Sequence, residues 1–122
     1  MLRQVYYSFL FVLLFSSCGN PLPTLEGIDI AAWKDDKNGC IGYRSKSLEA
    51  LQLQKDKIKA LSETDIVKLL GRPDRNELYK RNQKFFHYFL EPGGVCGIDN
   101  KTPKRLSIRF NATERAKEVI IE

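Results

Sequence analysis

The sequence predicts an α+β fold in which a two-helix hairpin packs on a three- to four-stranded antiparallel sheet. Three observations predict it. Helical periodicity is concentrated in residues 45–70, alternation of apolar and polar residues dominates residues 77–121, and a marked helix end separates the two parts. Helices followed by strands, rather than the two in alternation, are typical of α+β domains. The 122 residues leave room for one small domain.

The clearest helix covers residues 62–70. Ser62 stands where an N-cap belongs, and Asp65 follows three residues later, as in a capping box. Gly71 supplies a left-handed turn after the last apolar residue, and Pro73 prevents the helix from continuing. Between these signals lies one apolar face, formed by Ile66, Leu69 and Leu70.

An earlier helix is predicted over Ser45–Lys59, capped by Ser45 or Ser47. The link that follows, residues 59–61, is very short, so we expect the two helices to pack as a hairpin. The buried face of the earlier helix is expected to hold Leu48, Leu51 and Ile58.

Strands are predicted at residues 77–80, 84–90, 105–110 and 116–121. Side chains alternate between the two faces of a strand. One face of the second strand therefore carries Phe86, Tyr88 and Leu90, and the other carries Phe85, His87 and Phe89. In the third strand a solvated face is expected to hold Arg105, Ser107 and Arg109.

The start of the chain has the order of a secretory signal. A single charge, Arg3, precedes an apolar run from Val5 to Phe15, and small residues precede Cys18. The run is short for a membrane span, which needs about 20 apolar residues, although an uncleaved anchor is the alternative.

Residues Leu14-Phe15-Ser16-Ser17-Cys18-Gly19-Asn20 resemble a bacterial lipobox, with Phe15 where leucine usually stands. The resemblance implies a lipoprotein signal peptide over residues 1–17, palmitate or a similar acyl chain on Cys18, a tether over residues 18–27 and a domain over residues 28–122. No Asp follows Cys18, so the implied location is the cell outer membrane, with the lipid-anchored domain facing the periplasm. The implied first partner is thus the membrane itself.

Three cysteines are present, and acylation of Cys18 leaves Cys40 and Cys96 as one pair. Disulfides persist outside the cytoplasm, so we expect a bond between them, with free thiols or metal ligation as the alternatives. No metal site is expected, because neither cysteine has a second Cys or a His at ligand spacing and His87 is the single histidine.

The net charge is +5, and the basic residues are scattered along the chain. Scattered charge favours a solvated surface over a nucleic-acid site, so no nucleic-acid partner is expected.

The helix end Leu69-Leu70-Gly71-Arg72-Pro73, the strand Phe86-His87-Tyr88-Phe89-Leu90 and the strand ending Arg109-Phe110-Asn111 resemble the small outer-membrane lipoprotein family typified by BamE, also called SmpA. The resemblance covers about residues 45–121. It implies a helical pair against a three-stranded antiparallel sheet, a fold shared with β-lactamase inhibitors, and an envelope-assembly role. The segments 33–44 and 93–104 depart from the family pattern.

The function we expect is a non-enzymatic, lipid-anchored protein-interaction or envelope-assembly module with an envelope protein as partner and no cofactor. Aromatic and arginine residues anchor interfaces, so the candidate partner-binding residues are Tyr79, Arg81, Phe85, His87 and Arg109. The alternative is a small-ligand or inhibitor-type binding protein. An enzyme is less favoured, and no catalytic residue is assigned, because the chain has one His and no nucleophile motif or phosphate-binding glycine loop.

Overall fold

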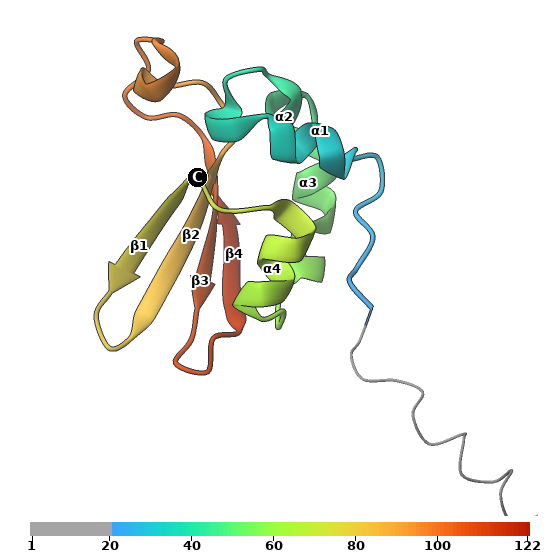
Figure 1. Cartoon of the computed structure of the whole chain (residues 1–122), viewed down its shortest axis with the longest axis vertical. Helices are drawn as coiled ribbons and strands as arrows, with labels where there is room; N and C mark the ends of the chain where they lie inside the picture. The colour runs from blue at the N-terminus through green and yellow to red at the C-terminus, as the bar shows by residue number, and fades with distance from the viewer. Residues whose placement is uncertain (1–20) are drawn as a thin grey trace, which may run out of the picture.

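Within residues 21–122, a four-stranded antiparallel sheet with strand order β1-β2-β3-β4 forms one layer, and four α-helices form the other. This computed structural model describes residues 21–122. Figure 1 shows the helices gathered on one side of the sheet, with β1 farthest from them. The α+β class and the antiparallel sheet predicted from the sequence are confirmed, with four strands.

The strands are β1 (Arg75–Tyr79), β2 (Gln83–Phe89), β3 (Arg105–Phe110) and β4 (Ala116–Ile121). Each pairs with the next, so the sheet is a simple meander. The turn between β1 and β2 has positive φ at Arg81 (63°) and Asn82 (60°), the arrangement that the twist of a tight hairpin favours. This turn fixes which β1 side chains lie beside those of β2.

The helical layer contains α1 (Ile30–Asp35), α2 (Tyr43–Lys46), α3 (Leu48–Gln54) and α4 (Glu63–Leu70), so it holds more helices than the two expected. The prediction of one helix over Ser45–Lys59 was wrong. The chain leaves helical geometry at Ser47, whose hydroxyl donates to the Tyr43 carbonyl, and α3 passes into the 3-10 segment η3 (Lys55–Ile58). Neither Ser45 nor Ser47 caps a helix with its side chain.

The prediction for α4 is confirmed at both ends. The Ser62 hydroxyl accepts a hydrogen bond from the Asp65 backbone N–H at 3.2 Å, which satisfies one free donor of the first turn. Gly71 follows the helix with φ 83°, a conformation that glycine adopts without strain. The face of α4 that packs on the sheet is fully or nearly fully buried.

The core lies between the helices and the inner face of the sheet. Its largest side chains are Trp33 of α1 and Tyr88 of β2. Phe86, Tyr88 and Leu90 all point into it, as the alternation in β2 predicts. Leu25 is also buried in this core, although it falls within the tether expected over residues 18–27. The packed part of the chain therefore begins before residue 28.

The β4 edge of the sheet is covered by the link between η3 and α4. Ala60 N–H donates to the Ala116 carbonyl at 2.8 Å, and Ala116 N–H donates to the Leu61 carbonyl at 2.8 Å. The Lys55 ammonium donates to the Val119 carbonyl at 3.1 Å. These contacts occupy backbone groups that an edge strand otherwise offers to other chains. β1, at the opposite edge, has five exposed residues.

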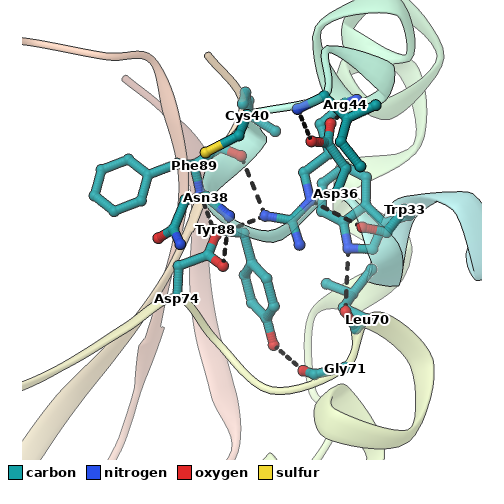
Figure 2. Close-up of polar contacts among 12 residues, drawn as sticks. Trp33, Asp36, Asn38, Cys40, Arg44, Leu70, Gly71, Asp74, Tyr88 and Phe89 are labelled. Atoms are coloured by element: carbon teal, nitrogen blue, oxygen red, sulfur yellow. Dashed lines mark hydrogen bonds and ion pairs between the residues drawn. The ribbon is translucent and has the colours of Figure 1, made fainter. Parts of the chain in front are cut away.

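A buried ion pair holds the helical layer to the sheet. The Arg44 guanidinium lies 2.6 Å from a carboxylate oxygen of Asp74, and the two side chains are 1% and 4% exposed. Arg44 also donates to the Trp33 carbonyl at 3.0 Å and to the Phe89 carbonyl at 3.2 Å. Figure 2 shows this guanidinium enclosed by groups from α1, β2 and the segment before β1.

The carboxylates around Arg44 also organise the nearby backbone. Asp74 accepts from the backbone N–H groups of Phe89 (2.8 Å) and Asn38 (3.0 Å). Asp36 accepts from the backbone N–H groups of Ile41 (2.6 Å) and Arg44 (2.8 Å). A buried charge costs free energy unless it is paired and hydrogen-bonded, and each of these groups has several partners. Asp36 and Asp74 therefore have a structural role.

The predicted disulfide between Cys40 and Cys96 is present and joins the helical layer to the loop after β2. It closes a loop with a sequence separation of 56 residues. Chain-entropy estimates give about 4 kcal/mol of stabilisation for such a loop. Gly39, beside it, has φ 67°, and a Cβ at this position would lie 2.9 Å from the Phe89 carbonyl oxygen. Only glycine lets this turn approach the end of β2 so closely.

Replacing Arg44 with Ala should lower the free energy of unfolding by about 3–5 kcal/mol, because Asp74 would remain buried without its cation. Urea denaturation of the oxidised protein followed by Trp33 fluorescence measures the loss. Arg72→Ala, at an exposed position, serves as the control. Equal stabilities of the two variants would contradict a structural role for the buried pair.

Candidate functional site

No helix of the described residues covers the second face of the sheet, which we call the outer face (Figure 1). Strand register defines its rows, since Glu77 pairs with Phe85, Phe85 with Arg109, and Arg109 with Glu118. A shallow concavity of about 310 Å³ lies on this face. Its lining residues are Glu77, Tyr79, Phe85, His87, Arg105, Arg109, Glu118, Ile120 and Glu122.

Three rings form a continuous aromatic row on the outer face. The Tyr79 and Phe85 rings meet edge to face with centroids 5.8 Å apart, and the Phe85 and His87 rings stack at 5.7 Å. Such pairs add roughly 0.5–1.5 kcal/mol beyond the burial of their area. Tyr79 is exposed and Phe85 is half-buried, so the row offers apolar surface on a rigid strand.

A chain of hydrogen bonds crosses the sheet beneath this row. Glu77 Oε2 lies 2.8 Å from His87 Nε2, and His87 Nδ1 lies 2.7 Å from Ser107 Oγ. Ser107 Oγ donates to Glu122 Oε1 at 3.0 Å, and Arg105 donates to the same oxygen at 3.1 Å. One side chain from each of β1 and β2, two from β3 and that of the residue after β4 thus form a single network.

The network needs three protons for its three central contacts. Ser107 donates its proton to Glu122, so its oxygen remains available as an acceptor for His87 Nδ1, while His87 Nε2 faces the Glu77 carboxylate. The hydrogen bond from His87 holds the pKa of the Glu77 carboxyl below its ordinary value, and the nearby Arg75 and Arg105 act in the same direction.

Two arginine–glutamate pairs border the aromatic row. Arg105 lies 3.0 Å from Glu122, and Arg109 lies 3.1 Å from Glu118. Both pairs are partly exposed, and exposed pairs contribute little to stability, so their main effect is to order the guanidinium groups. The outer face therefore combines ordered charges with aromatic surface.

The structure brings four of the five sequence-predicted residues to this concavity: Tyr79, Phe85, His87 and Arg109. Arg81 lies in the β1–β2 turn and does not line it. His87 is 2% exposed, so it supports the surface from beneath and does not present its ring to a partner. The expectation of a solvated Ser107 was wrong, because the hydroxyl is buried between His87 and Glu122.

The sequence did not identify Glu77, Glu118 or Glu122 as members of the site. Alternation alone assigns each to a face but does not say which side chains are neighbours. That information lies in the strand register, which the positive-φ turn at residues 81–82 sets for β1.

A larger cavity, of about 680 Å³, opens where the outer face meets the loop between β2 and β3. Figure 1 shows this loop projecting beyond the ends of the strands. Its floor is made by Arg75, Phe89, Arg105 and Glu122, and its other walls come from Asn38 and from the loop itself. We call this space the loop cavity.

Three tethers hold the loop in place. At its neck, Leu90 N–H donates to the Lys104 carbonyl at 2.8 Å. Near its tip, Cys96 of η4 (Gly94–Cys96) is bonded to Cys40. Gly93 packs so closely on the returning chain that a Cβ there would lie 2.9 Å from Pro103 Cγ. The loop cavity is therefore held by covalent and hydrogen bonds.

Comparisons with protein-family models, with curated proteins and with solved structures each found no match. The resemblance to the BamE family thus stays a prediction. Cys18 and the lipobox-like segment lie outside the described residues. Between residues 21 and 122, no helix has the length and apolar character required to cross a membrane.

Replacing His87 with Phe should raise the pKa of Glu77 toward its ordinary value, because the variant keeps a ring but loses the nitrogen that hydrogen-bonds to the Glu77 carboxylate. NMR titration of the Glu77 carboxyl carbon measures the shift. Since the folded pKa is lowered, the stability from this contact is present above the unfolded pKa and is lost as pH falls through the folded one. Phe85→Leu is the control, and an unchanged Glu77 midpoint in His87→Phe would refute the assignment.

Proposed function

We propose that this protein is a non-enzymatic, lipid-anchored cell-envelope module that docks an envelope protein through the outer face of its sheet. The observation that carries the proposal is the uncovered outer face, where Tyr79 and Phe85 lie between ordered arginines. Aromatic and arginine side chains are enriched at interface centres, and ion pairs are typical of the rim. The network through His87 makes this surface rigid before a partner arrives, which lowers the entropy cost of binding.

The envelope location is supported by two independent features. The segment around Cys18 resembles a lipobox, and two acyl chains hold a small domain at a membrane stably. The Cys40–Cys96 bond is of the kind that persists in oxidising compartments. We infer an outer-membrane anchor with the domain facing the periplasm, and the resemblance to BamE-type lipoproteins favours a role in envelope assembly.

Glu77, His87 and Ser107 lie in the order of a carboxylate–histidine–serine triad, yet their environment favours a structural role. Ser107 is 1% exposed, and its hydroxyl binds Glu122. A nucleophile must reach the substrate and have donors nearby for the developing oxyanion. A hydroxyl buried in the middle of a strand with its proton engaged does not meet that requirement, which supports a binding module over a hydrolase.

A photoreactive amino acid at Phe85 in the full-length protein, expressed in its native envelope, tests the docking face. We expect one specific protein adduct after irradiation, identified by mass spectrometry and strongly reduced by Arg109→Ala or Tyr79→Ala. The same probe at Leu53, an exposed residue of α3 in the helical layer, is the matched control. Absence of an adduct at Phe85, or equal labelling from Leu53, would argue against the outer face.

Metabolic labelling with an alkyne fatty acid tests the anchor. The wild-type chain should carry label and remain in the outer-membrane fraction, while Cys18→Ser should lose both label and membrane retention, because no thiol remains for acylation. An unlabelled wild-type chain that stays in the membrane would instead favour an uncleaved anchor.

A second candidate function, a small-ligand or inhibitor-type binding protein, is favoured by the loop cavity. Its volume of about 680 Å³ lies within the range of small-molecule sites, roughly 300–1,000 Å³. This cavity also adjoins the proposed docking face, so a protein bound to that face would lie beside the cavity.

A further inference from the structure

The loop cavity and the outer-face concavity adjoin each other, and we call the two together the groove. Arg105 and Glu122 line both, so the two hollows meet at these residues. Along β2, Phe89 lines the loop cavity, and Phe85, four residues away, lines the outer-face concavity. At about 3.3 Å per residue this stretch is about 13 Å long, the length of four to five residues of extended polypeptide.

The walls of the loop cavity expose apolar side chains that a soluble surface usually hides. Val95 is 78% exposed and Ile98 is 49% exposed, and both line the cavity together with Phe89 and Pro103. Grouped apolar exposure on a rigid loop marks an interaction site, whereas single exposed apolar residues are ordinary. The disulfide at Cys96 keeps these residues in position although Val95 is mostly exposed and Ile98 is only half-buried.

Charge at the cavity indicates the chemistry of the occupant. Three cations line it, and one of them, Arg105, is paired with Glu122. Arg75 and Lys101 make no ion pair within residues 21–122, and neither does Asp99, the remaining acidic residue of the lining. The unpaired charges thus favour an anionic group, and a carboxylate beside Arg75 can be held by two hydrogen bonds.

We propose that the groove binds an extended segment of the partner protein that places an apolar side chain in the loop cavity and an adjacent Asp or Glu against Arg75 and Lys101. The groove is open and elongated, as an extended chain requires, while a small ligand is usually enclosed on most of its surface. This inference rests on the proposed docking function and adds the chemistry of the bound segment.

The test uses the full-length protein in lipid nanodiscs and a phage-displayed library of random linear peptides. Selection on the wild type, after depletion on empty nanodiscs, should enrich sequences with a large apolar residue within two positions of Asp or Glu. A synthetic peptide from that set should bind Arg75→Glu/Lys101→Glu at least about tenfold more weakly, because two favourable charges become repulsive. Ile98→Asp should weaken binding as well.

Arg72→Glu/Lys117→Glu is the matched control, since it makes the same charge change at exposed positions outside the groove. Peptide enrichment without acidic residues, no enrichment, or equal loss in the control variant would each overturn the proposal. A photoreactive group at Ile98 in the native envelope gives a further readout, and an adduct of small-molecule mass there would assign the cavity to a small ligand.

The two proposals fail in different ways. In one outcome the Phe85 probe captures a partner protein, the Ile98 probe captures none, and peptide affinity is unchanged in Arg75→Glu/Lys101→Glu. That outcome would support the docking face and refute the proposed chemistry of the bound segment. If no position on the outer face captures a protein, the docking function itself is wrong.

Discussion

The ion pair between Arg44 and Asp74 is the contact on which the arrangement of the layers depends. One guanidinium binds a carbonyl of α1, a carbonyl at the end of β2 and a carboxylate just before β1. It also lies over the Trp33 ring at 4.7 Å. Apolar packing is nondirectional, so it would leave several ways to place α1 and α2 on the sheet. Multiple directed hydrogen bonds select one of them.

The ion pair between Arg44 and Asp74 also affects the candidate site. Asp74 holds the Phe89 backbone, and Phe89 forms the floor of the loop cavity. The Cys40–Cys96 bond ties the loop above that floor to the turn beside Arg44. The shape of the loop cavity therefore depends on contacts made by two segments outside the strands, residues 33–44 and residues 93–104.

Elements with local signals could be predicted from sequence. Ser62 and Gly71 mark α4 by hydrogen bonding and backbone freedom within a few residues, and alternation assigns Phe86 and Tyr88 to the core. The break in the helix at Ser47 could not be predicted, because the sequence around it has helical periodicity. The bend is stabilised by distant contacts, such as the hydrogen bond from the Ser45 hydroxyl to the Leu90 carbonyl. Local propensity is a weak prior when distant partners compete.

The candidate site was predictable in its residue types and less so in its geometry. Tyr79, Phe85 and Arg109 lie together, as their strands suggest, but the burial of His87 follows from the particular neighbours Glu77 and Ser107. Arg44 shows the same limit, because its burial needs three acceptors from distant parts of the chain. Contacts between residues far apart in the sequence produce no periodic pattern in it, so they cannot be predicted from periodicity.

The covered edge at β4 has a consequence for self-association. Growth of a sheet from one molecule to the next without end requires two free edges on each molecule, one to accept a strand and one to offer it. Here the link at Ala60–Ser62 and the Lys55 ammonium occupy one edge. Pairing through β1 would therefore stop at two copies, so the protein would not polymerise through its sheets even at high concentration.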